Sequence, residues 1–242
     1  MALLSLENVS KTFGGVMAVK SVSLQVEPGE VLGVMGPNGS GKTTLFNLVS
    51  GALVPNSGTI RFKGAPITGL PPHRICRQGI ARTFQLVRPF LGLTARQNIL
   101  VGLGYGCRPL SGSAAREKSE ELLASVGLEG LGDRPASTLT AMDRKRLDLA
   151  RALATSPDLL LLDEFMAGLN PQETSEAMGL IRRLQARGLT LVLVEHIVWA
   201  LLELSQRIVV LSAGEKIAEG PPTAIARDPR VVEIYLGSIP FP

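Results

Sequence analysis

Short apolar runs alternate with amphipathic stretches along this chain, and their order predicts strands and helices in turn. Apolar positions alternate over 3–9 and 19–26, and a continuous apolar run occupies 31–35. Alternation favours strands buried on one face, whereas a short continuous run favours a strand buried on both faces. The same reasoning predicts further strands at 59–63, 159–162, 190–194 and 207–211, with a turn at 212–215 leading into 216–218.

Apolar residues at helical spacing predict helices between these strands. The chain is helical in character from 72 to about 156, and the tail 221–242 contains one short helix-like piece and no motif. Strands that alternate with helices imply an α/β sheet that is mainly parallel. The expected helices cover 44–49, 113–126, 143–154 and 171–187.

The segment 36–43 carries the clearest chemistry, because it fits the phosphate-binding pattern G-x-x-x-x-G-K-[ST]. Its glycines let backbone N–H groups converge on phosphate oxygens, and the following helix N-terminus adds positive potential. Lys42 would reach the β- and γ-phosphates, and the Thr43 hydroxyl would bind Mg²⁺. A glycine-rich turn with a chance lysine is the alternative. The residues expected to line the nucleotide are Gly36, Pro37, Asn38, Gly39, Ser40, Gly41, Lys42, Thr43 and Thr44.

Two carboxylates, Asp163 and Glu164, end the apolar run 159–162. Ligands sit at the carboxyl ends of strands in open α/β sheets, and adjacent strand residues face opposite ways. We therefore expect Asp163 to hold Mg²⁺ and Glu164 to polarise the water that attacks the γ-phosphate. A pair of solvated acids is the alternative.

Composition limits the class of protein without defining a function. The chain has 242 residues, an apolar fraction of 45% and a net charge of +4. No apolar run approaches the ~18 residues of a membrane span, and the N-terminus lacks the basic region of a signal peptide. Cys76 and Cys107 show no metal or redox spacing, which suggests a reducing cytoplasm.

Taken together, these motifs and their order resemble the nucleotide-binding subunits of ATP-binding cassette (ABC) transporters over nearly the whole chain. The resemblance implies a P-loop NTPase core with a mainly parallel sheet, an N-terminal antiparallel β subdomain and an inserted helical subdomain. It also implies ATP and Mg²⁺ as ligands, and ATP hydrolysis as the activity. The single nucleotide-binding domain would comprise a RecA-like core with the β subdomain (1–84 and 157–220), a helical subdomain (85–156) and a C-terminal tail (221–242).

Four further residues take roles from the same resemblance. Gln85 matches the Q-loop glutamine, which contacts Mg²⁺ and faces the membrane subunits. His196 follows the strand 190–194 and matches the switch histidine that contacts the γ-phosphate. Phe13 matches the aromatic residue that stacks on adenine, with Val19 beside it. Without the family context, His196 would be read as structural and Phe13 as core.

The signature motif departs from the family's Leu-Ser-Gly-Gly-Gln, because this chain has Leu-Thr-Ala-Met-Asp at 139–143. In the family, this helix N-terminus donates to the ATP held by the opposite subunit. Thr140 with Asp143 predicts a capping box, while Met142 restricts backbone approach and Asp143 places negative charge near phosphate. The charge weakens phosphate binding unless a basic residue offsets it, for which the candidates are Arg144, Lys145 and Arg146. A capped helix without phosphate contact is the alternative.

Two other stretches have alternative interpretations. Asn170 stands where the family often has aspartate, and Asn before Pro171 with Glu173 predicts a capped helix start. Five arginines near Gln85 are either a solvated basic face or a contact with phospholipid heads or a coupling helix. They are Arg74, Arg77, Arg82, Arg88 and Arg96.

The stretches 81–102 and 162–171 look like the branched-chain amino-acid importer ATPases, although no residue here reads the substrate. We expect transmembrane permease subunits, a second and different ATP-binding subunit, and a periplasmic or extracellular binding protein as partners. The chain would lie peripherally on the cytoplasmic face of the cell membrane, without nucleic acid. The alternatives are a soluble ABC ATPase acting on nucleic acid or ribosomes, and a hydrolysis-weak cassette that gates by ATP binding.

Overall fold

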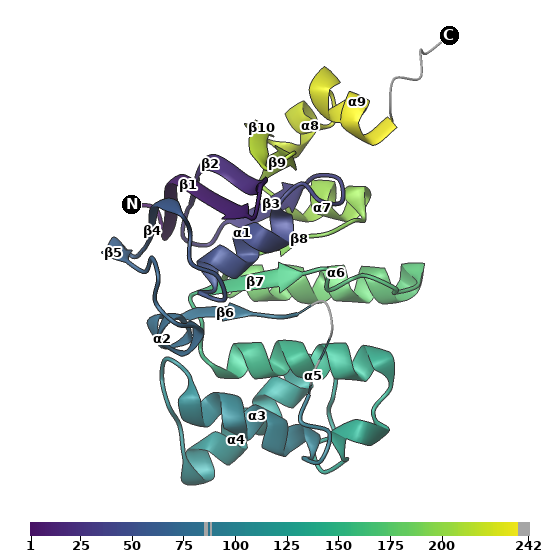
Figure 1. The fold of residues 1–242 in the computed structure, drawn as a ribbon. Helices are drawn as coiled ribbons and strands as arrows, with labels where there is room; N and C mark the ends of the chain where they lie inside the picture. The colour runs from purple at the N-terminus through teal and green to yellow at the C-terminus, as the bar shows by residue number, and fades with distance from the viewer. Residues whose placement is uncertain (85–86, 88, 237–242) are drawn as a thin grey trace.

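Two β-sheets and a group of helices build the molecule (Figure 1). A computed structural model describes residues 1–84, 87 and 89–236, and structural statements below concern these residues. The smaller sheet is antiparallel, with four strands in the order β2-β1-β4-β5. Its strands are β1 (Leu4–Phe13), β2 (Val16–Val26), β4 (Ser57–Phe62) and β5 (Ala65–Pro66).

The larger sheet has six strands in the order β10-β9-β3-β8-β7-β6. All neighbours are parallel except the β9–β10 hairpin. Every residue of β3, β7 and β8 is buried, which is why these strands are continuous apolar runs in the sequence. The strands are β3 (Val31–Met35), β6 (Ile80–Arg82), β7 (Leu159–Asp163), β8 (Thr190–Val194), β9 (Arg207–Ser212) and β10 (Glu215–Gly220).

Helices cover the larger sheet, and three of them form a separate layer beyond β6 (Figure 1). In that layer α3, α4 and α5 pack on one another. Mixed sheets with inserted helices confirm the predicted α/β fold class. The helices are α1 (Lys42–Val49), α2 (Pro72–Gln78), α3 (Ala95–Tyr105), α4 (Gly112–Ser125), α5 (Ala141–Ala154), α6 (Pro171–Ala186), α7 (Val198–Leu204), α8 (Pro222–Ile225) and α9 (Pro229–Leu236), with a 3₁₀ turn at Ala136–Thr138.

The element predictions were wrong at two places. The stretch assigned helical character from residue 72 contains the strand β6, which pairs in parallel with β7. Three residues are too few for a periodic signal, so only its partner strand identifies it. The tail holds two helices, α8 and α9, rather than one. No helix in the described part of the chain is long and apolar enough to cross a membrane.

Strand β7 shows how one apolar run serves two cores. Leu159 and Leu161 belong to the core beneath the antiparallel sheet and α1, whereas Leu160 and Leu162 belong to the core shared with α3–α7. Successive strand residues point to opposite faces, so a four-leucine run fills both layers. The strand then delivers Asp163 to the carboxyl edge of the sheet.

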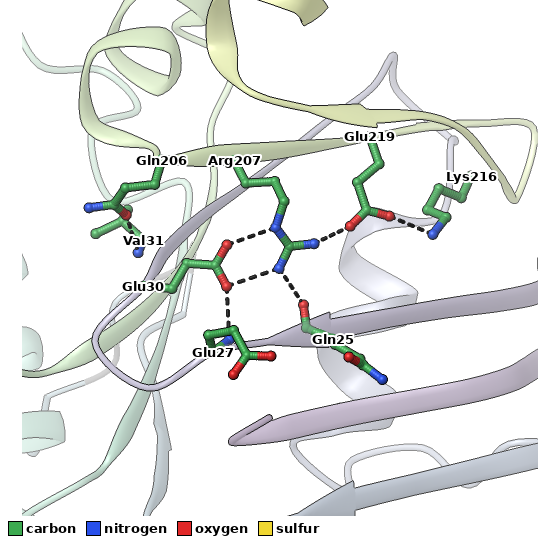
Figure 2. Close-up of polar contacts among 8 residues, drawn as sticks. All are labelled: Gln25, Glu27, Glu30, Val31, Gln206, Arg207, Lys216 and Glu219. Carbon is green, nitrogen blue, oxygen red and sulfur yellow. Dashed lines mark hydrogen bonds and ion pairs between the residues drawn. The ribbon is translucent and has the colours of Figure 1, made fainter. Parts of the chain in front are cut away.

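At the amino end of the same sheet, Arg207 ties several segments together (Figure 2). Its guanidinium pairs with both oxygens of Glu30, at 2.8 and 2.9 Å, and donates to the Gln25 carbonyl at 2.6 Å. It also pairs with Glu219, which in turn accepts from Lys216 at 2.6 Å. The cluster joins β9, β10, the end of β2 and the turn before β3, so it fixes the antiparallel sheet against the parallel one.

Candidate functional site

The loop 36–41 turns sharply between β3 and α1, and its glycines are required there. Gly36, Gly39 and Gly41 have φ values of 154°, 79° and 103°, which non-glycine residues rarely adopt. A Cβ at Gly36 would lie 2.2 Å from the Leu211 carbonyl oxygen, and one at Gly41 would lie 2.4 Å from that of Ala18. The loop therefore has this shape only with glycine at both positions.

Other segments hold the loop from outside. Lys20 N donates to Gly214 O at 2.7 Å, and Gly214 N donates to Ser40 O at 3.1 Å. Strand β2 and the β9–β10 turn thus brace the loop. The Ser40 hydroxyl is buried and has no hydrogen-bond partner among the described residues, as expected of a loop whose polar groups face a ligand.

The side chain of Lys42, which is expected to bind the nucleotide phosphates, lies across the loop 36–41. Its Nζ donates to Gly36 O at 2.7 Å and Pro37 O at 3.0 Å. Burial lowers the Lys42 pKa, while the charges of Glu164 and Asp163 oppose the shift. Helix α1 begins here with no side-chain cap, so its first N–H groups remain available to an anion.

Asp163 and Glu164 take different partners at the end of β7. Asp163 pairs with Arg82, with 2.7 Å between Oδ2 and Nη2, and both side chains are buried. Glu164 has φ of 53°, and its Oε1 lies 2.7 Å from His196 Nε2. The structure therefore brings together the two residues expected to handle the attacking water and the γ-phosphate.

Glu195, beside His196, is buried beneath the same turn. Its Oε1 accepts from Met166 N at 2.8 Å, whereas Oε2 has no partner in the described part of the chain. Burial raises the Glu195 pKa to about 7. Lys145 of α5 donates to Phe165 O at 3.1 Å and also to the Ala167 carbonyl. Glu195 and Lys145 together hold the turn that follows Glu164.

The signature helix α5 begins as expected but is capped differently. Thr140 Oγ1 accepts from Asp143 N at 3.1 Å. Asp143 does not return the bond to the backbone, because its Oδ2 instead accepts the Thr140 hydroxyl at 2.7 Å. Met142 points into a hollow of about 620 Å³ between α5 and α6, next to Arg146.

None of the three basic neighbours considered as an offset for Asp143 makes an ion pair with it in the described residues, since each has another partner. Arg144 donates to Ser137 O at 2.7 Å, and Arg146 pairs with Glu176 at 2.7 Å. Lys145 serves the turn after Glu164. The Asp143 charge therefore remains beside the helix N-terminus. By contrast, Asn170 and Glu173 form the complete capping box that was predicted for α6.

The two residues expected to hold adenine differ in accessibility. Phe13 ends β1 with 46% of its surface exposed, and the Lys11 ammonium lies 5.4 Å from its ring centroid. Val19 is completely buried and packs behind Gly41. Val19 thus supports the loop from within the core, and the adenine contact of both residues stays a prediction.

The arginine cluster expected near Gln85 is not one basic face. Arg82 is buried against Asp163, and Arg96 pairs with Glu120 and Asp133. Of the four members of this cluster in the described residues, Arg74 and Arg77 lie exposed on α2. Gln85 and Arg88 lie outside the described residues, so the Q-loop assignment stays a prediction.

A hollow of about 690 Å³ opens between the parallel sheet and the helical layer. Its wall includes Thr43 and Asp163 together with Phe84 and Phe90. The Arg151 guanidinium lies 4.7 Å from the Phe90 ring centroid. Burial raises the pKa of Asp148, which also lines the hollow. Candidate metal-site residues and exposed aromatic side chains thus share one cavity.

Sequence comparisons identify the class of protein that this fold and loop define. The family described as "ABC transporter" matches residues 19–167, and the chain belongs to that family. A further family, described as "Branched-chain amino acid ATP-binding cassette transporter", matches residues 215–238. The tail had been considered free of motifs, so this match is one that sequence reasoning missed.

Curated relatives and solved structures agree with the assignment. The chain is 39% identical to the high-affinity branched-chain amino acid transport ATP-binding protein BraF of Pseudomonas aeruginosa, covering 97% of this chain and 98% of BraF. It is 40% identical to LivG of Escherichia coli K12, with the same coverage. A crystal structure of the ADP conformation of an ATP-binding cassette superposes with a TM-score of 0.89 at 33% identity, covering 98% and 100% of the two chains. The chain is therefore an ATP-hydrolysing cassette, as the sequence predicted.

Proposed function

We propose that this chain powers an importer of branched-chain or other hydrophobic amino acids by hydrolysing ATP. The observation that carries the proposal is about 40% identity to BraF and LivG from end to end. The match at 215–238 adds support, because it covers β10 and most of the tail, beyond the residues matched by the general transporter family, and belongs to a branched-chain amino-acid family. Hydrolysis would use Glu164 as the base and His196 as its neighbour, which lie in hydrogen-bond contact.

Mg²⁺ fits the residues at the site. Thr43 and Asp163 offer hydroxyl and carboxylate oxygens, the ligands that Mg²⁺ prefers, and both line one hollow. No group of three His, Cys, Asp or Glu side chains in the described residues could hold an ion alone, so the nucleotide phosphates would complete the shell. Bound there, Mg²⁺ would neutralise phosphate charge, while Lys42 and the loop N–H groups orient the phosphates.

The proposed partners follow from the surfaces around the site. The hollow beside Phe84 and Phe90 would receive a permease subunit, which would hold the cassette peripherally on the cytoplasmic face of the membrane. A second, different ATP-binding subunit would face the altered signature at Thr140 and Met142, and a periplasmic or extracellular binding protein would deliver the substrate. In this scheme residues 1–84 and 157–220 form the ATPase core, 85–156 the helical subdomain and 221–242 the tail.

The closing experiment is uptake of radiolabelled leucine, isoleucine and valine by cells lacking this chain. Wild-type chain should restore uptake, and Lys42→Ala should not, because removing its ammonium weakens ATP binding. Restored uptake by Lys42→Ala would contradict the ATP-driven role. A hydrolysis-weak gating cassette would instead retain uptake with Glu164→Gln.

A second candidate rests on one relative. The chain is 37% identical to the lipopolysaccharide export system ATP-binding protein LptB of Acidithiobacillus ferridurans, covering 97% of each chain. Normal amino-acid uptake combined with an outer-envelope defect in the deletion strain would favour export. The match at 215–238 favours the amino-acid system.

A further inference from the structure

Arg82 is held in place by more contacts than its ion pair requires. Its Nη1 donates to Asn47 Oδ1 at 2.6 Å and to Ser50 Oγ at 3.1 Å, both on or at the end of α1. Its guanidinium lies 5.6 Å from the ring centroid of Phe46 and 5.2 Å from that of Phe84. The side chain therefore stays in this position whether or not Asp163 accepts its remaining hydrogen bond.

Asp163 needs a counter-charge because it is 3% exposed at the end of a buried strand. A buried carboxylate without a partner is strongly unfavourable. The nearby ammonium of Lys42 is occupied by the carbonyls of Gly36 and Pro37. Arg82 is thus the cation that directly contacts Asp163, at 2.7 Å.

We propose that Arg82 is a positioning residue that serves as the counter-cation of Asp163 in the metal-free protein and competes with Mg²⁺ for that carboxylate. The inference rests on the proposed magnesium site. A divalent ion at Asp163 repels the guanidinium, which then keeps Asn47 and Ser50 as partners. After this release the carboxylate holds the metal ion, and the guanidinium keeps its two acceptors on α1 through Nη1, while Nη2 loses its partner.

The replacement of Arg82 by Mg²⁺ at Asp163 takes place at the wall of the hollow between the sheet and the helical layer. Arg82 and Phe84 both line that hollow, and the guanidinium lies against the Phe84 ring. Arg82 ends β6 two residues before Phe84, so a change in its pairing acts on the aromatic wall. With a metal ion at Asp163, the Arg82 charge beside the Phe84 ring is no longer neutralised by that carboxylate.

The test compares Arg82→Gln with the wild type in thermal unfolding, in the presence of a saturating non-hydrolysable ATP analogue. Without Mg²⁺, we expect the midpoint of the variant to fall by about 5–15 °C, because Asp163 is left buried and unpaired. Mg²⁺ at about 10 mM should raise the midpoint of the variant more than that of the wild type and remove most of the difference. The matched control is Arg207→Gln, which also removes a paired arginine and should keep its deficit relative to the wild type when Mg²⁺ is added.

A second readout is the Mg²⁺ concentration that half-maximally enhances ATP binding, measured by calorimetry. For Arg82→Gln this midpoint should fall about tenfold, because a competing positive charge is gone. Equal Mg²⁺ responses of Arg82→Gln and the wild type in both measurements would overturn the proposal.

Two further variants distinguish an error in the proposed magnesium site from an error in the proposed role of Arg82. Asp163→Asn should raise the Mg²⁺ midpoint, and an unchanged midpoint would show that the proposed magnesium site is wrong. A raised midpoint in Asp163→Asn with no change in Arg82→Gln would leave the site standing and reject the role of Arg82. If Arg82→Gln does not fold in either condition, Arg82→Lys decides. Its ammonium cannot span Asp163, Asn47 and Ser50 together, so a midpoint identical to that of the wild type would reject the proposal.

Discussion

Arg207 and Arg82 each place a guanidinium against a carboxylate on the six-stranded sheet, but at opposite ends of its strands. Arg207 begins β9 and binds both oxygens of Glu30, whose carboxylate otherwise accepts only the backbone N–H of Glu27 among the described contacts. Arg82 ends β6 and binds one oxygen of Asp163. With Arg82 as proposed above, the same ion-pair chemistry is structural at the amino ends and functional at the carboxyl ends, where ligands bind in α/β sheets.

The amino and carboxyl ends of the sheet also differ in their buried polar atoms that lack a hydrogen-bond partner. Four of the six buried side-chain atoms without a hydrogen-bond partner in the described residues lie around the nucleotide loop and β7: Ser40 Oγ, Arg82 Nε, Thr83 Oγ1 and Glu195 Oε2. The other two are Arg144 Nε on α5 and Ser205 Oγ, just before β9. None of the side chains drawn in Figure 2 contributes such an atom. Unpaired buried groups cost stability, so the carboxyl end gives up stability to keep groups available for chemistry.

The largest expected effect follows a change at the carboxyl end. Glu164→Gln should slow ATP hydrolysis about 10²–10⁴-fold while leaving ATP binding intact, because the amide cannot accept the proton of the attacking water. Phosphate release by the assembled transporter is the measurement. Glu30→Gln is the control at the amino end and should leave turnover per folded molecule unchanged. Unchanged turnover in Glu164→Gln would show that Glu164 is not the base.

A change at the amino end should act on stability alone. Arg207→Met is expected to lower the free energy of unfolding by about 2–4 kcal/mol, because it leaves Glu30 partly buried without its bidentate partner. Urea denaturation measures the loss, and calorimetry should show the ATP affinity of the folded fraction unchanged. Arg74→Met, at an exposed position on α2, is the control. A loss of ATP affinity in Arg207→Met would contradict the division between the two ends.

The raised pKa of Glu195 predicts how the stability of the protein depends on pH. Its folded-state pKa of about 7 exceeds its ordinary value of 4.5, so the folded protein holds an extra proton between these values. Wild-type stability should therefore fall as pH rises through this window and level off above pH 7. Glu195→Gln keeps the acceptor for Met166 N and should remove this decline, gaining on the order of 1–3 kcal/mol at about pH 8. Urea denaturation from about pH 5 to pH 8 is the measurement, and parallel curves for both proteins would contradict the burial argument.

The smallest expected effect concerns the altered signature. Met142→Gly with Asp143→Gln should raise the ATPase activity of the chain alone by a few-fold, since it removes a side chain and an uncompensated charge from the helix N-terminus. Full cooperative hydrolysis by the unmodified chain alone would contradict the proposed pairing with a different ATPase. Gln172→Ala on α6 serves as a control for the expression and purification of variants.

Local patterns made much of this molecule predictable. Strands β3 and β8 occupy the predicted residues because a doubly buried strand is a continuous apolar run bounded by polar residues. The loop at Gly36 was recognisable because its glycines and lysine are contiguous. Asn170 could be identified as a helix cap because its partner Glu173 is three residues away.

The remainder depends on contacts that no local pattern encodes. Arg82 was interpreted as part of either a solvated basic face or a contact with phospholipid heads or a coupling helix, yet its carboxylate partner lies 81 positions further along the chain. Glu195 carries no motif, and its raised pKa follows from burial, which the hydrogen bond from Met166 N only partly offsets. Lys145 was a candidate to offset Asp143, but the carbonyls of the turn after Glu164 offer it better partners. In each case the tertiary packing determines which partner the charged side chain contacts.

The bracing of the nucleotide loop by Ala18, Lys20 and Gly214 has a consequence for biosynthesis. The ribosome makes the loop early, but the β9–β10 turn that hydrogen-bonds to Ser40 appears near the end of translation. We therefore expect a nascent chain to acquire tight nucleotide affinity only after Gly214 has left the exit tunnel. ATP binding by ribosome-bound chains of increasing length would then report the completion of folding rather than the synthesis of the loop.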